Sequence, residues 1–138
     1  MNIEMMIASL PRSYGLINVD YFKELIDVIG IAQSINPRVT TIRVDLRYPA
    51  SLQGDDMPCM ALVDREDKIT RFFKSLRAKL GVLSQKKHKA GIRHYPDNLH
   101  YVWAREHASS EYPHYHILLL LNKDSFYRTG DYRSPDSL

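Results

Sequence analysis

Two histidines separated by one residue are the feature of this sequence best suited to chemistry. His114 and His116 flank Tyr115, and an apolar run, residues 117–121, follows directly. In a β-strand, residues i and i+2 point to the same face, so the two imidazoles are attached about 6–7 Å apart. An unpartnered imidazole pair at the start of such an apolar strand would be costly to bury. The spacing therefore predicts that both rings bind one divalent metal ion.

A third ligand can come from the segment that precedes the pair. Residues 99–106 are rich in aromatic and β-branched side chains, and residues 108–113 supply turn chemistry, so we expect an antiparallel hairpin. If Glu106 pairs directly with His114, its carboxylate lies on the histidine face, whereas a register shifted by one residue puts His107 there instead. Two histidines and a carboxylate would suit Mg²⁺ or Mn²⁺, and three histidines would favour zinc or another transition metal.

The strand predicted from Thr40 to Tyr48 should lie beside the histidine strand. Its apolar and charged residues alternate, so one face is apolar and the other charged. Arg43, Asp45 and Arg47 either line the face that carries the metal site or form a surface ladder of ion pairs.

Two amphipathic helices flank this strand in the sequence. The first runs from about Val19 to Gln33, with Asn18 or Asp20 as its N-cap. The second runs from about Arg65 to Leu80, and Gly81 is suited to end it, because glycine commonly follows the last residue of a helix.

A further short helix is predicted after the hairpin, capped by Asn122 or Asp124. The order helix, strand, helix, hairpin, helix predicts an α+β fold in which helices pack against an antiparallel sheet. We expect Trp103 to lie in its core.

Composition limits the class of protein. The chain has 138 residues, of which 44% are hydrophobic and 25% charged, which is typical of a single globular domain. No apolar run approaches the ~20 residues that span a bilayer, and the N-terminus lacks the basic leader of a signal peptide, so we expect a cytoplasmic protein. The single cysteine, Cys59, excludes an intramolecular disulfide.

The net charge of +3 is compatible with a nucleic-acid partner but does not require one. The basic stretch 84–94 is predicted to contact DNA phosphates beside the metal site, and its alternative is a solvated loop. The candidate DNA-binding residues are Arg43, Arg47, Lys86, Lys87, Lys89 and Arg93.

Several segments resemble known protein families. His114-Tyr115-His116 is similar to the histidine–hydrophobic–histidine signature of HUH endonucleases, the superfamily of rolling-circle replication initiators. Residues 103–106, 113–116 and 118–122 resemble the inovirus-type replication protein family, which occurs in prophages as the YagK/YfjJ C-terminal domain. The helix at 69–76 and the strand at 41–48 are similar to the elements that precede the pair in that family, so the resemblance covers roughly residues 38–128.

The resemblance implies a ferredoxin-like, HUH-type antiparallel sheet and rolling-circle initiation for a filamentous phage or prophage, with single-stranded DNA of the replication origin as partner. His114 and His116 match the metal ligands and Glu106 matches the acidic ligand position. Mg²⁺ or Mn²⁺ would polarise the scissile phosphate, and a tyrosine would attack it in line, which forms a phosphotyrosine bond and releases the 3′ oxygen of the cleaved strand as a free hydroxyl.

The family's nucleophilic tyrosine has a lysine nearby and lies well downstream of the histidine pair. None of the 9 tyrosines here has a lysine three or four residues later. Tyr127 and Tyr132 are the downstream candidates, and both lie close to His116. We therefore expect a catalytic domain that is truncated at its C-terminus and lacks the nucleophile.

The predicted organisation is an N-terminal helical segment (1–37), an incomplete HUH-like α+β domain (38–128) and a frayed tail (129–138). Two other functions fit the same sequence. One is a non-enzymatic, ferredoxin-like module that binds nucleic acid and whose histidines are structural. The other is an unrelated metal-dependent phosphohydrolase.

Overall fold

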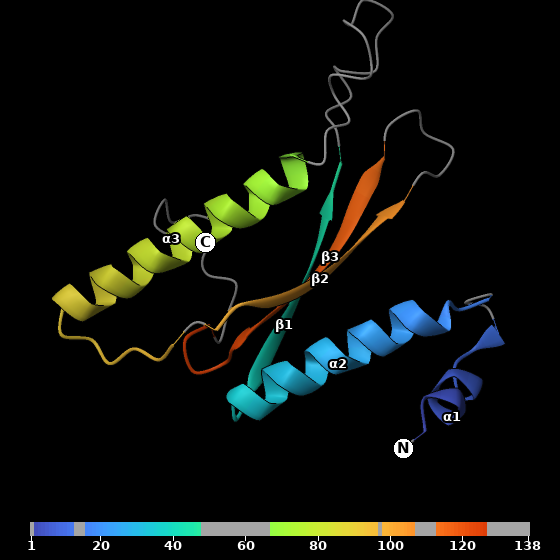
Figure 1. The fold of residues 1–138 in the computed structure, drawn as a ribbon. Helices are drawn as coiled ribbons and strands as arrows, with labels where there is room; N and C mark the ends of the chain where they lie inside the picture. The colour runs from blue at the N-terminus through green and yellow to red at the C-terminus, as the bar shows by residue number, and fades with distance from the viewer. Residues whose placement is uncertain (1, 13–15, 48–66, 97, 107–112, 127–138) are drawn as a thin grey trace, which may run out of the picture.

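The computed structural model describes residues 2–12, 16–47, 67–96, 98–106 and 113–126 (Figure 1). The elements in chain order are α1 (Ile3–Ala8), α2 (Val19–Ile35), β1 (Val39–Leu46), α3 (Asp67–Lys89), β2 (His100–Glu106) and β3 (His114–Asn122). These elements confirm the predicted α+β class. The predictions for Cys59, His107, Tyr127, Tyr132 and the tail 129–138 fall outside the described residues.

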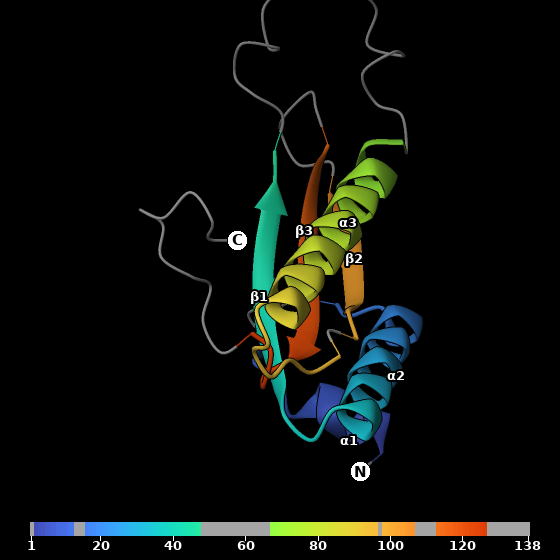
Figure 2. The same cartoon turned by 90° about the vertical axis from the view of Figure 1, so that its left-hand side faces the viewer.

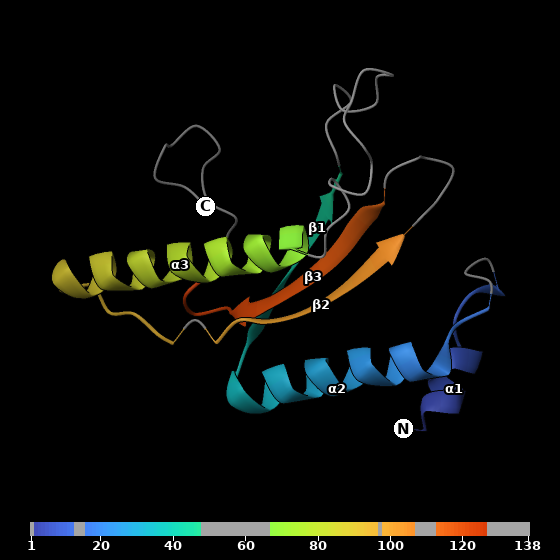
Figure 3. The same cartoon turned by 45° about the horizontal axis from the view of Figure 1, so that its top comes forward.

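The three strands form one antiparallel sheet in the order β1-β3-β2. The last strand along the chain is therefore the central one, and α3 and α2 lie on opposite sides of the sheet (Figure 3). A strand covered on both faces reads as a continuous apolar run rather than an alternating one. This explains why residues 117–121 of β3 are all isoleucine or leucine.

The core lies between the sheet and α3. Ile69 and Phe73 of α3 pack against Tyr115, Ile117 and Leu119 of β3. A second cluster, at the other end of β3, consists of Leu80, Leu121 and Phe126. Each fully buried aliphatic or aromatic side chain of this kind contributes about 1.5–3 kcal/mol, so this interface is the main source of stability.

Trp103 does not belong to this core, and its predicted burial is wrong. It is 42% exposed, and its ring meets that of Tyr115 edge-on, with centroids 5.8 Å apart. The reason is its place on β2, an edge strand whose last four residues, 103–106, are all exposed.

The predicted first helix is confirmed as α2. Of its two candidate caps, Asn18 is the one observed, since its Oδ1 accepts hydrogen bonds from the backbone N–H groups of Asp20 and Tyr21 at 3.0 and 3.2 Å. This pairing satisfies donors that the first turn of a helix otherwise leaves unpaired.

The predicted end of the second helix at Leu80 is wrong. α3 continues through Gly81 to Lys89, and the stop is Gly91, whose φ of 67° suits glycine. Two backbone hydrogen bonds, Gly91 N–H to His88 O at 3.1 Å and Ile92 N–H to Lys87 O at 3.0 Å, close the helix in a Schellman motif. Residues 84–89 of the basic stretch are therefore helical, which contradicts the alternative of a solvated loop.

In place of the short helix expected after the hairpin, residues 123–125 form a turn. Asn122 Oδ1 accepts a hydrogen bond from the N–H of Asp124 at 3.0 Å. Among the described helices, none combines the length and the apolar character needed to cross a membrane.

Candidate metal centre

Three potential ligands lie at one end of the sheet, on the face opposite α3. Glu106 ends β2, and His114 and His116 begin β3. Glu106 pairs with His114 and Ala104 with His116, which is the first of the two registers considered from the sequence. Because residues directly opposite in an antiparallel pair share a face, the Glu106 carboxylate is placed beside both imidazoles.

The ligand atoms of this cluster converge. Glu106 Oε2 lies 2.9 Å from His114 Nε2 and 2.7 Å from His116 Nε2. One ligand atom from each of the three residues fits within a group whose members are all within 4.8 Å of one another. The two imidazoles stand nearly perpendicular, at 86°, so both Nε2 atoms approach the carboxylate from different directions. Two imidazoles and a carboxylate in this arrangement could hold one divalent cation.

Asp45 of β1 completes the surroundings of His116. The β1–β3 register places Asp45 opposite His116, and its Oδ1 lies 2.7 Å from His116 Nδ1. Arg43 lies beside them, with Nε 3.2 Å from the same Asp45 oxygen and Nη2 3.4 Å from His116 Nδ1.

The two contacts of Nδ1 require opposite proton positions. A carboxylate can only accept, whereas a guanidinium can only donate, and the contact with Asp45 is much the shorter. Nδ1 of His116 therefore carries a proton and donates it to Asp45. This arrangement directs Nε2 toward Glu106 and His114, as carboxylate partners of metal-binding histidines commonly do.

The charges of these groups are coupled. The hydrogen bonds that His116 donates to Asp45 and, with the next largest effect, to Glu106 raise the pKa of His116 above its ordinary value of 6.5. The hydrogen bond to His116 is in turn the main cause that lowers the pKa of both Asp45 and Glu106. Without a metal ion, a protonated His116 between two carboxylates satisfies the cluster. Positive charge is thus favoured at the point where a cation would bind.

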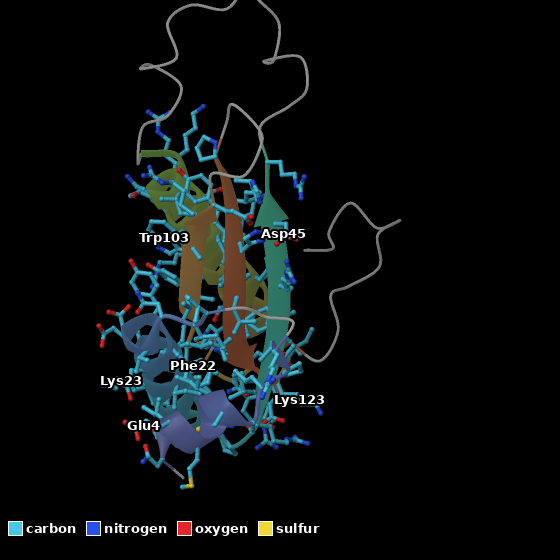
Figure 4. The ribbon with its side chains drawn as sticks, turned by 90° about the vertical axis from the view of Figure 1, so that its right-hand side faces the viewer. Glu4, Phe22, Lys23, Asp45, Trp103 and Lys123 are labelled. Atoms are coloured by element: carbon cyan, nitrogen blue, oxygen red, sulfur yellow. The ribbon has the colours of Figure 1, made fainter. Side chains whose placement is uncertain are left out.

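The cluster is open to solvent. The side chains of Glu106, His116 and His114 are 51%, 30% and 12% exposed. α2 crosses the lower part of this face and leaves the upper part, near Asp45, uncovered by the described helices (Figure 4). An extended polymer could therefore reach the cluster.

The other predicted site residues separate into two groups. Arg43 shares the alternation of β1 with Asp45 and is exposed on the cluster's side of the sheet, and Arg47 is exposed directly after the end of β1. Lys86, Lys87, Lys89 and Arg93 lie in or after the last turn of α3. Lys87 Nζ donates a hydrogen bond to Ser125 O at 3.3 Å, just past the far end of β3.

The prediction that the basic stretch lies beside the metal site is therefore wrong. β3 has 9 residues, which at ~3.3 Å per residue puts its two ends about 26 Å apart. No pattern in the sequence indicates at which end of the sheet α3 finishes. No pattern indicates that Asp45 pairs with His116 in particular either, because only the register between strands distant in the sequence decides that contact.

Fold and site together define an α+β domain with a candidate two-histidine, one-carboxylate metal centre on an exposed face of an antiparallel sheet. Residues 2–138 match the model of the YagK/YfjJ C-terminal domain family, and the chain belongs to this family.

Two curated relatives come from Escherichia coli strain K12. The chain is similar to uncharacterized protein YagK, at 34% identity over 126 residues, which cover 91% of this chain and 61% of the relative. It is similar to uncharacterized protein YfjJ at 33% identity over 120 residues, which cover 82% of this chain and 54% of the relative. The chain thus spans little more than half the length of these relatives. No solved structure matches it significantly.

Proposed function

We propose that this protein binds a divalent metal ion through Glu106, His114 and His116 and uses it to position a phosphodiester of single-stranded DNA. In this proposal it is the metal-binding part of a rolling-circle replication initiator of the HUH type, from a filamentous phage or prophage. The observation that carries the proposal is the convergence of three ligand atoms within 4.8 Å on an open sheet face.

The donor set favours particular ions. Carboxylate oxygen suits Mg²⁺ and Mn²⁺, whereas imidazole nitrogen suits transition metals. With two imidazoles and one carboxylate, we expect Mn²⁺ to bind more tightly than Mg²⁺. When bound, such an ion supplies Lewis-acid polarisation of a phosphoryl oxygen.

Residues beside the cluster would orient the metal-binding side chains and contact the DNA strand. Asp45 fixes the ring of His116 through Nδ1, which preserves the direction of Nε2. Arg47, exposed directly after β1 and two residues from Asp45, would contact a neighbouring phosphate, because guanidinium groups bind phosphate oxygens through two parallel N–H donors.

The described tyrosines of the hairpin do not face the cluster. Tyr115 is buried against α3, and Tyr101 stacks on Phe73 with ring centroids 3.6 Å apart. Tyr127 and Tyr132 therefore remain the candidates for a nucleophile, and neither is followed three or four residues later by a lysine. We expect metal-dependent DNA binding and no more than a trace of covalent nicking.

The test offers a labelled single strand with Mn²⁺ or with chelator, and measures both fluorescence anisotropy and protein–DNA adducts on a denaturing gel. We expect Mn²⁺ to tighten binding in the wild type but not in His114→Ala or His116→Ala. His94→Ala, which changes an exposed histidine outside the cluster, is the matched control.

Three outcomes would contradict the proposal or part of it. DNA binding that is unchanged by Mn²⁺ and by both histidine substitutions would favour the non-enzymatic module. Metal-dependent release of a cleaved product without an adduct would favour a phosphohydrolase. A strong adduct lost in Tyr127→Phe or Tyr132→Phe would show that the chain does carry its nucleophile.

A further inference from the structure

The charge of this protein is concentrated on one helix. α3 contains eight lysines and arginines and one acidic residue, Asp67. The whole chain has a net charge of +3, so the residues outside α3 together carry a net −4. The mild overall basicity therefore conceals one strongly positive element in an otherwise acidic molecule.

The basic side chains lie on the side of α3 that faces away from the sheet. Ile69, Phe73 and Leu80 face the sheet and are buried. Figure 2 looks onto the outer side of α3 with the sheet behind it. The exposed cations of α3 are Lys68, Arg71, Lys74, Arg77, Lys79, Lys86 and Lys89. At 3.6 residues per turn, Arg71, Lys74 and Lys89 form a row opposite the buried stripe, and the others flank it. From Arg71 to Lys89 this row extends for about 27 Å at 1.5 Å per residue.

Helix stability does not explain this row. Cations in the last turn complement the helix dipole, which accounts for the basic residues near Lys89. It does not account for Arg71 and Lys74 in the first half of α3, three residues apart, where two like charges repel each other. Among the described residues, no ion pair involves Arg71, Lys74, Lys79 or Lys89.

We propose that the outer face of α3 binds the phosphate backbone of double-stranded DNA. This surface lies on the opposite side of the sheet from the metal cluster, so the proposal does not depend on the function assigned to that cluster. A row of cations neutralises phosphates and releases their counterions, which gives binding that is strong at low salt and independent of base sequence.

A duplex fits this face better than a single strand does. Proteins that bind single strands without sequence preference stack the bases on aromatic side chains. The aromatic residues of α3, Phe72 and Phe73, pack against the core instead. A rigid helix with positive charge along its length also matches a stiff polymer, and the persistence length of duplex DNA is about 50 nm.

The outer face is equally unsuited to entering a membrane. Helices that lie in a bilayer interface combine a basic face with an apolar one that is free to insert. In α3 the apolar face is occupied by the sheet. Among the described residues of α3, Val82 is the exposed large hydrophobic side chain, and one such side chain does not make an apolar face.

The experiment measures binding of the full chain to a blunt duplex of about 16 base pairs, longer than α3, by fluorescence anisotropy over a salt series. Chelator is present throughout, so that the metal cluster does not contribute. The test variant is Arg71→Glu/Lys74→Glu. The control is Arg12→Glu/Lys23→Glu, which changes the net charge equally at exposed positions outside α3; Figure 4 shows Lys23 on α2.

We expect the test variant to bind at least about tenfold more weakly, with a salt slope reduced by about 1.8, since each lost phosphate contact contributes about 0.9. We expect the control to stay within about threefold of the wild type. Lys79→Gln/Lys89→Gln, a milder pair, should weaken binding in the same direction and guards against a folding defect in the charge-reversal variant.

Equal losses in the test and control variants would overturn the proposal, because they would reflect net charge alone. Tighter binding to the corresponding single strand in chelator would also contradict it. Binding to vesicles containing phosphatidylserine, without binding to the duplex, would assign the surface to a membrane instead.

Discussion

The position of one proton on His116 decides what the cluster of Glu106, His114 and His116 can bind. Asp45 holds the proton on Nδ1, and the other nitrogen, Nε2, meets Glu106 at 2.7 Å. A metal ion needs the lone pair of Nε2, so it must displace a proton there. Asp45 is thus a positioning residue rather than a ligand, and its effect is separable from that of the three ligands.

Removal of Asp45 should weaken metal binding without abolishing it. We expect Asp45→Ala to reduce Mn²⁺ affinity about 10–100-fold, which is typical for partners of ligating histidines, and Asp45→Asn to reduce it less, because its amide oxygen still accepts from Nδ1–H. Calorimetric titration measures both. The ¹⁵N shifts of His116 should report a changed tautomer in Asp45→Ala, whose side chain no longer accepts from Nδ1–H, and not in Asp45→Asn. Asp27→Ala, which alters an exposed carboxylate on α2, should leave affinity and shifts unchanged.

The raised pKa of His116 makes stability depend on pH in opposite ways with and without metal. In the metal-free protein, the contribution of protonated His116 is fully present below its ordinary pKa of 6.5 and is lost as pH rises through the raised folded value. Metal binding needs neutral Nε2, so Mn²⁺ should stabilise more as pH rises over the same interval.

Thermal unfolding at several pH values, with Mn²⁺ or chelator, measures this pH dependence. His116→Gln should remove both trends, whereas His94→Gln should keep them. A metal-induced stabilisation that grows toward acid pH would contradict the assignment of His116 as a ligand.

At the scale of elements, short-range and long-range features of the sequence differ in how well they predict structure. The hairpin, α2 and the strand β1 follow from alternation, helical spacing and the cap at Asn18, all of which act within a few residues. The end of α3 does not, because glycine is permissive and ends a helix only where the chain takes a positive φ. Gly81 continues the helix and Gly91 stops it.

Alanine at these two glycines should therefore have opposite effects. A Cβ at Gly81 meets nothing within 4 Å, and Gly81→Ala should stabilise the protein by about 0.5–1 kcal/mol because alanine favours the helix interior. At Gly91 the space is equally open, but the φ of 67° should make Gly91→Ala cost about 1–2 kcal/mol. Urea unfolding measures both. A stabilising Gly91→Ala would mean that the helix does not end there.

At the scale of the whole molecule, the sheet separates two surfaces of different chemistry. One face carries the cluster of histidine and carboxylate groups. The helix α3, with its exposed cations, covers the other face (Figure 2), and Asp45 is seen from the opposite side (Figure 4). Single-stranded DNA at the metal cluster and duplex DNA along α3 would contact different residues, so both could bind at the same time. This separation is a consequence of packing α3 and the metal cluster on opposite sides of β3.

The sequence alone determined the hairpin, the common face of His114 and His116, and Glu106 as one of two candidates for a third ligand. These follow from the two-residue period of a strand and the short loop of a hairpin, which leave few arrangements. Tertiary structure alone decided that Glu106 lies opposite His114, that Asp45 reaches His116 across 71 residues, and that the basic end of α3 lies far from the metal cluster. The contacts from β1 and α3 depend on how distant segments pack, and packing is set by the whole buried core rather than by any local pattern.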